Sequence, residues 1–189
     1  MSDLHHQDSD ATLSRWLNLA ALLAICASLT MAFIWQVVYN ELPCPLCQLQ
    51  RVALILVGVG LMLNLRFGPA AVHYSIILAS ALGGAVASAR QDLLHIVPGD
   101  KGYGSALFGL HFYTWAFISF VIVMIFCAVM ISIDRNRLRA SSQVVRSGVV
   151  AAALIWFFLA ISAANTVNSL MICKLGPCPE NPTVYLWKF

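Results

Sequence analysis

Long apolar runs separated by short polar segments dominate the chain. Uncharged runs cover residues 17–38, 70–89, 112–133 and 148–167. A hydrocarbon core about 30 Å thick requires roughly 20 apolar residues in a helix. Because lipid offers the backbone no hydrogen-bond partners, a helical bundle is the architecture that such spans permit. The pattern therefore predicts four membrane-spanning helices.

A fifth apolar run, 52–65, is too short to span by itself. It becomes long enough when its helix starts near Leu46, which gives a span over 46–65. Cys47 and Arg51 then lie in the first turns of this helix, at the headgroup boundary. We predict an all-α integral membrane helical bundle with five spans.

Composition supports the same class. Apolar residues make up 60% of the 189 residues and charged residues 10%, which is outside the range of soluble domains. The net charge is +3, and no basic patch with interleaved aromatic residues occurs. We therefore expect a lipid bilayer around the chain and no nucleic acid partner.

The arginines and lysines indicate the orientation, because cytoplasmic loops are enriched in them. Five spans place the two chain ends on opposite sides, and four of the arginines cluster in 134–147, beside two span ends. We expect 1–15 to be a cytoplasmic tail, 16–169 the transmembrane bundle and 170–189 an outward-facing tail. The segments with Cys44, Cys47, Cys173 and Cys178 then face an oxidising compartment, where disulfides persist.

The motif Cys44-Pro45-Leu46-Cys47 is the strongest chemical signal. Pro45 suits the first position of a helix, so the positive end of the helix dipole is expected to lie at Cys47. Arg51, one turn later, adds a positive charge on the same face, and both effects favour a reactive thiolate. A disulfide closing so short a loop stabilises a fold little. Redox function is favoured over a structural clip.

A second pair, Cys173 and Cys178, flanks a Gly-Pro turn after the last span. These residues are suited either to a redox-active disulfide or to one that stiffens a loop. Together with the first pair they also allow a zinc site made of four cysteines. Cys26 and Cys127 lie inside spans, where a thiol behaves as a small apolar side chain.

These residues resemble the bacterial disulfide bond formation protein B family, membrane proteins that reoxidise a periplasmic thiol oxidase with a quinone. The most specific part is Cys44-Pro45-Leu46-Cys47 with Arg51, supported by Pro98, Gly109-Leu110 and Trp115. The resemblance implies a four-helix core, here followed by a fifth C-terminal helix, with a short interfacial segment in the second periplasmic loop. In the family that loop carries the second cysteine pair, whereas 90–111 contains no cysteine. Cys173 and Cys178 are the candidates to replace it.

The resemblance also implies the roles of the site residues. Cys47 would face a membrane quinone, ubiquinone or menaquinone, and Arg51 would hold its head group. Cys44 would exchange with Cys173 and Cys178, which would accept electrons from a periplasmic thioredoxin-fold thiol oxidase. The expected location is the bacterial inner membrane, as a multi-pass protein with a cytoplasmic N-terminus and a periplasmic C-terminus. No metal is expected.

Two other hypotheses stay open at the level of sequence. One is a quinone-linked reductase of the vitamin K epoxide reductase type. The other is a non-enzymatic membrane protein whose cysteines are structural or bind zinc.

Overall fold

The chain forms a bundle of long helices. A computed structural model describes residues 2–100, 102–139 and 148–174 and five further tail residues, with side chains from residue 11 onward except that of Arg139. The tail residues are Gly176, Cys178, Pro179, Pro182 and Tyr185. The elements are α1 (Ser2–Tyr39), α2 (Pro45–Phe67), α3 (Ala71–Leu94), β1 (Ala106–Leu107), β2 (Leu110–His111), α4 (Phe112–Ile133), η1 (Arg137–Arg139) and α5 (Val149–Cys173).

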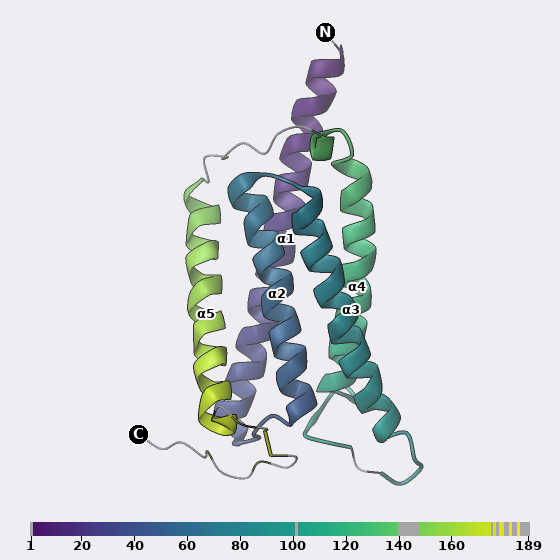
Figure 1. Ribbon diagram of the computed structural model, residues 1–189, viewed down its shortest axis with the longest axis vertical. Helices are drawn as coiled ribbons and strands as arrows, with labels where there is room; N and C mark the ends of the chain where they lie inside the picture. Colours follow the sequence, from purple (N-terminus) through teal and green to yellow (C-terminus); the bar gives the residue numbers. More distant parts are fainter. Residues whose placement is uncertain are drawn as a thin grey trace.

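The five α-helices of the described part are each long and apolar enough to cross a membrane. The prediction of an all-α integral membrane bundle is confirmed. Figure 1 shows α1 to α5 side by side, with the start of α1 and the end of α5 at opposite ends of the bundle. Helix α5 packs against α1 and α2, whereas α3 packs between α2 and α4. The segments before α2 and after α3 and α5 all lie at one end, which we call the thiol end.

Two glycines allow the helices of the core to approach closely. A Cβ atom on Gly84 of α3 would lie 2.3 Å from the ring of Phe120 on α4. A Cβ atom on Gly58 of α2 would lie 2.2 Å from the ring of Phe158 on α5. Both phenylalanines are fully buried. Lipid provides no hydrophobic driving force between spans, so helices associate through close van der Waals packing, which these small residues allow.

At the opposite end of the bundle, a buried polar cluster links α1, α3 and the end of α4. Asp134, fully buried, accepts hydrogen bonds from Ser14 (2.8 Å) and from the hydroxyl of Tyr74 (2.6 Å). Ser14 falls within 1–15, the stretch expected to be a tail, yet α1 begins at Ser2 and Ser14 is buried. At least the end of that stretch therefore belongs to the packed bundle.

The connection from α3 to α4 contains the end of a helix and a short β-hairpin. Leu93 and Leu94 form the exposed end of α3, which runs five residues beyond the predicted span. Further along, β1 and β2 pair antiparallel. Phe108 and Gly109, at the tip of this hairpin, both have positive φ, as the tight turns of hairpins require. The hairpin leads directly into α4 and brings the loop over the thiol end.

Candidate functional site

The first cysteine pair is organised by the start of α2. Pro45 is the first helical residue, and Cys44 occupies the cap position with an extended backbone. The Cys44 sulfur accepts a hydrogen bond from the backbone N–H of Cys47 at 3.2 Å. A proline at the first helical position lacks an N–H that would have no helical partner there anyway. The Cys-Pro-x-Cys spacing thus makes one thiol the helix cap and places the other in the first turn.

The two sulfurs lie close together and share a polar neighbour on α3. The Sγ atoms of Cys44 and Cys47, both free thiols, are 2.7 Å apart. The amide nitrogen of Gln91 lies 3.3 Å from the Cys44 sulfur and 3.5 Å from the Cys47 sulfur. Gln91 is itself held by Gln50, whose amide donates to Gln91 Oε1 at 2.9 Å. The pair can therefore open and close against a fixed donor.

Cys44 is the activated thiol outside the span. A hydrogen bond from the Cys47 thiol and those from the backbone of Cys47 and Leu46 lower the pKa of Cys44 to about 7, against the opposing effect of burial. The expectation from sequence placed the helix N-terminus at Cys47. The cap geometry instead gives its donors to Cys44, because the cap residue's side chain is the one that turns back toward the first N–H groups.

Arg51 carries a positive charge into the bundle among neutral acceptors. Its Nη1 donates to Gln36 Oε1 on α1 at 2.7 Å and to Asn165 Oδ1 on α5 at 3.4 Å, and its Nη2 donates to the carbonyl of Ala32 at 3.0 Å. The side chain is 9% exposed, and none of the described carboxylates pairs with it. A charge held in this way attracts electron-rich groups in the space beside it.

That space is a cavity of about 410 Å³ between α1, α2, α4 and the loop before α4. Cys47 and Arg51 both line it. Most of the remaining wall is apolar or aromatic and includes Met31, Leu54 and Phe112. The indole N–H of Trp35, another lining residue, is buried without a hydrogen-bond partner in the described structure. The cavity thus offers a flat apolar ligand a largely apolar wall beside a cation.

The loop before α4 forms the outer wall of the cavity and is hydrogen-bonded to the segment between α1 and α2. The hydroxyl of Tyr103 donates to the carbonyl of Leu42 at 2.6 Å, and burial raises the pKa of Tyr103 to about 12. The hydroxyl of Ser105 donates to the Glu41 carboxylate. The indole N–H of Trp115 donates to the carbonyl of Leu107 at 3.0 Å. These bonds close the loop over the segment that leads into Cys44.

Cys173 and Cys178 form a disulfide at the thiol end, where Cys173 is the last residue of α5. Cys173 ends α5 and packs with Ile172 and Leu42, with Cys178 and Tyr185 against them. Leu42 lies two residues before Cys44, so the last turn of α5 contacts the segment that carries the first pair. Tyr185 continues this contact inward, because its hydroxyl accepts a hydrogen bond from Gln36 at 3.2 Å.

The structure thus brings Cys44, Cys47, Arg51, Cys173 and Cys178, the site residues predicted from sequence, to one end of the bundle. Sequence reasoning missed four polar residues that connect them: Gln36, Gln48, Gln91 and Asn165. All four are buried amides within apolar spans. Polar residues inside a span are rare and mark functional interiors, so their presence was an available signal. Their partners, however, lie on other helices.

Comparisons with known proteins find a match over the first half of the chain. Residues 14–102 match the family described as Disulfide bond formation protein DsbB. This segment contains both cysteines of the first pair and Arg51. The match stops before the hairpin, α4 and α5.

A curated relative points the same way. The Disulfide bond formation protein B of Hahella chejuensis is 32% identical over 92 residues, which cover 47% of this chain. The alignment covers 56% of the relative, so the chain spans little more than half of its length. No solved structure matches the chain.

The described residues give no support to the alternative of a zinc site. Within the described residues, no three or more histidine, cysteine, aspartate or glutamate side chains gather as metal ligands would. Cys173 and Cys178 are joined to each other in the structure.

Proposed function

We propose that this protein is a membrane thiol-disulfide oxidoreductase that takes electrons from a periplasmic dithiol protein and passes them to a membrane quinone. The observation that carries the proposal is the position of Cys47, which contacts Cys44 on one side and lines the Arg51 cavity on the other. Electrons that enter through Cys44 thus have an exit through the adjacent sulfur. The match of residues 14–102 to the DsbB family supports the same chemistry.

The cavity fits the ring of a quinone. Its walls are largely apolar, and the Arg51 guanidinium suits an oxygen atom of such a ring. A bound quinone supplies a two-electron acceptor. Arg51 orients and attracts an electron-rich oxygen, while Cys47 presents its sulfur. Gln36 and Asn165 hold the guanidinium in place.

The first pair is suited both to accept electrons by thiol-disulfide exchange and to pass them on. Cys44, with a pKa of about 7, is substantially ionised at neutral pH and is a good leaving or attacking group. Gln91 donates to both sulfurs and accommodates a thiolate on either one. The chain's own residues therefore stabilise the reduced form of the pair, which makes its disulfide a stronger oxidant.

The second pair is the proposed entry point for electrons. A thiolate of a periplasmic thioredoxin-fold protein would open the Cys173–Cys178 disulfide, and the resulting dithiol would reduce the Cys44–Cys47 disulfide. The packing of Cys173 with Leu42 supports this route. It requires the thiol end to face the periplasm and the N-terminus to lie in the cytoplasm, as the arginine distribution favours.

The decisive experiment measures electron flow from thiol to quinone. The purified protein in lipid nanodiscs is mixed with a reduced thioredoxin-fold oxidase and with ubiquinone or menaquinone, and quinone absorbance is followed. We expect steady reduction by the wild type and none by Cys47→Ser. Absence of quinone reduction by the wild type with both quinones, or full activity of Cys47→Ser, contradicts the proposal.

A second experiment separates the two roles of the C-terminal pair. With the protein partner as reductant, Cys173→Ser is expected to lose turnover. With a small dithiol that reaches Cys44 directly, the same variant is expected to keep most of it. If Cys173→Ser turns over as fast as the wild type with the protein partner, the C-terminal disulfide is structural.

A further inference from the structure

Gln48 lies in the first turns of α2, and only the oxygen of its side-chain amide has a hydrogen-bond partner in the described structure. Its Oε1 accepts a hydrogen bond from the Ser169 hydroxyl at 2.6 Å, whereas its Nε2 is buried without a partner in the described structure. The residue is 6% exposed. Burying an amide N–H without an acceptor costs free energy, so this donor calls for an explanation.

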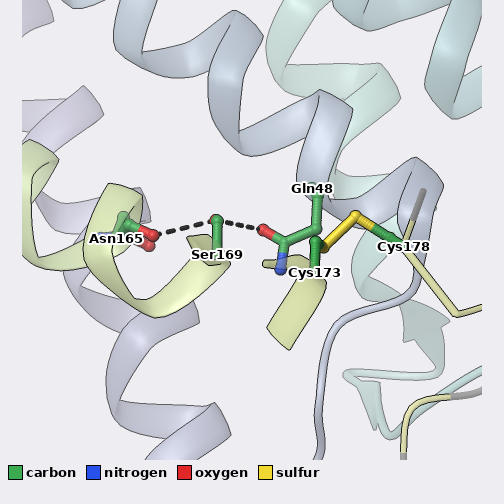
Figure 2. Close-up of a disulfide and its surroundings, with 5 residues drawn as sticks. All are labelled: Gln48, Asn165, Ser169, Cys173 and Cys178. Atoms are coloured by element: carbon green, nitrogen blue, oxygen red, sulfur yellow. Dashed lines mark hydrogen bonds between the residues drawn. A yellow bond between two sulfur atoms is a disulfide. The ribbon is translucent and has the colours of Figure 1, made fainter. Parts of the chain in front are cut away.

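Gln48 is linked through Ser169 to the helix that ends at Cys173 of the second cysteine pair. Ser169 precedes Cys173 by four residues in α5, so the two side chains occupy one face of that helix on successive turns. Figure 2 shows Gln48 between Ser169 and the disulfide, with its amide nitrogen on the side of Cys173. Ser169 is anchored in turn, since its hydroxyl also lies 2.9 Å from the carbonyl of Asn165. The amide is therefore held toward the end of α5.

Cys173 needs such a donor when its sulfur becomes negative. It is the last residue of α5, where the helix dipole disfavours negative charge. Ionisable groups on the segments packed around it are Tyr185, the adjacent Lys174, and Glu41 and Cys44, which flank Leu42. Cys173 is 8% exposed, whereas Cys178 is partly exposed. An incoming thiolate therefore reaches Cys178 more easily.

We propose that Gln48 donates a hydrogen bond to the Cys173 sulfur when the disulfide opens, which makes Cys173 the leaving thiolate and Cys178 the sulfur that the reducing protein attacks. This inference rests on the proposed function and adds the order in which its sulfurs react. The partner's thiolate forms a bond to Cys178 as the Cys173–Cys178 bond breaks, and Cys173 keeps the electron pair. The partner's second thiolate then displaces Cys178, so the partner leaves oxidised and the pair is a dithiol.

The same thiolate is then placed for the internal step. The Cys173 thiolate attacks Cys44 of the oxidised first pair, and the Cys44–Cys47 bond breaks to give a Cys47 thiolate. Cys178, deprotonated, then attacks Cys173, which restores the Cys173–Cys178 disulfide and releases Cys44. Two electrons have moved from the partner to the first pair. Gln48 follows Cys47 directly in the chain, so one residue borders both pairs.

The test uses the full chain with Cys44→Ser and Cys47→Ser, so that neither quinone nor internal exchange contributes. Oxidised protein in nanodiscs is treated with reduced glutathione, quenched with acid, and the cysteine that carries glutathione is identified by mass spectrometry. We expect glutathione mainly on Cys178. Gln48→Glu keeps an oxygen acceptor for Ser169 but removes the N–H donor, and it is expected to slow disulfide opening about tenfold, the effect of losing roughly one charge-assisted hydrogen bond.

Gln48→Leu, which adds no charge, is expected to slow opening in the same direction and to lower the ratio of Cys178 to Cys173 adducts. Ser162→Ala is the matched control, because it removes another buried, unpartnered polar group from α5, 11 residues before Cys173. It should leave the rate and the ratio unchanged. Glutathione mainly on Cys173 in the background protein, a disulfide that glutathione cannot open, or equal rates for Gln48→Leu and the background protein would each overturn the proposal. None of these outcomes depends on quinone reduction.

Discussion

The Nη1 atom of Arg51 lies 2.7 Å from Oε1 of Gln36, so an amide on α1 holds a charged guanidinium that α2 carries into the bundle. The other half of the Gln36 amide donates to the hydroxyl of Tyr185 in the C-terminal tail at 3.2 Å. One side chain thus links the cation of the cavity to the segment that follows the second cysteine pair. The position of Arg51 depends on three parts of the chain that are distant in sequence.

We expect Gln36→Leu to weaken quinone binding without removing the redox pair. Loss of the amide frees the guanidinium from its shortest bond, and a hydrogen bond to a charged group contributes about 1.5–3 kcal/mol. The KM for quinone should rise about tenfold or more, with a smaller change in kcat. Steady-state quinone reduction at varied quinone concentration measures both. Tyr185→Phe removes only the bond on the far side of the amide and should raise KM less; an equal rise in both variants would contradict this account.

The thiol of Cys44 should titrate near neutral pH. Because its pKa is about 7, the thiolate fraction and hence the rate of alkylation rise with pH up to about 7 and level off above it. Site-specific mass spectrometry of iodoacetamide labelling in the reduced protein gives the midpoint. Cys47→Ala removes the main hydrogen-bond donor and should move the midpoint upward. Cys47→Ser keeps a donor and should move it less, and a midpoint near that of an ordinary thiol in the wild type would refute the assignment.

Gln91 should matter for both sulfurs of the first pair. Its amide nitrogen lies within 3.5 Å of each, and Gln50 fixes its orientation. We expect Gln91→Leu to make the Cys44–Cys47 disulfide harder to reduce, because the reduced pair loses a donor to its thiolate. The equilibrium with a glutathione redox buffer measures the shift. Gln50→Leu leaves Gln91 present but less well oriented, so its shift should have the same sign and be smaller.

The contact between α3 and α4 predicts opposite effects for two adjacent glycines. A Cβ atom on Gly84 would meet the buried Phe120 ring at 2.3 Å, whereas a Cβ atom on Gly83 would meet nothing within 4 Å. Gly84→Ala should lower the free energy of unfolding by about 1–3 kcal/mol through overpacking. Gly83→Ala should be neutral or stabilising by up to about 1 kcal/mol, since alanine favours helix. Unfolding in mixed detergent compares the two, and equal losses would contradict this packing.

Part of this protein follows from its sequence for simple physical reasons. Apolar runs of bilayer length require helices, because the backbone must satisfy its own hydrogen bonds in lipid. Cys44-Pro45-Leu46-Cys47 sets its own local geometry, since a proline and two cysteines at this spacing form a helix cap within four residues. Arg51 lies one turn after Cys47, which places its charge on the same face of α2 as that thiol.

The tertiary structure alone decided which partners these residues have. Gln36, Gln91 and Asn165 come from α1, α3 and α5, and no local pattern predicts which of their faces meet the thiols and Arg51. The contact of Cys173 with Leu42 likewise depends on how α5 packs against α1 and α2. The cap at Cys44 depends only on residues close in sequence. The cavity beside Cys47 forms only where helices distant in sequence pack together.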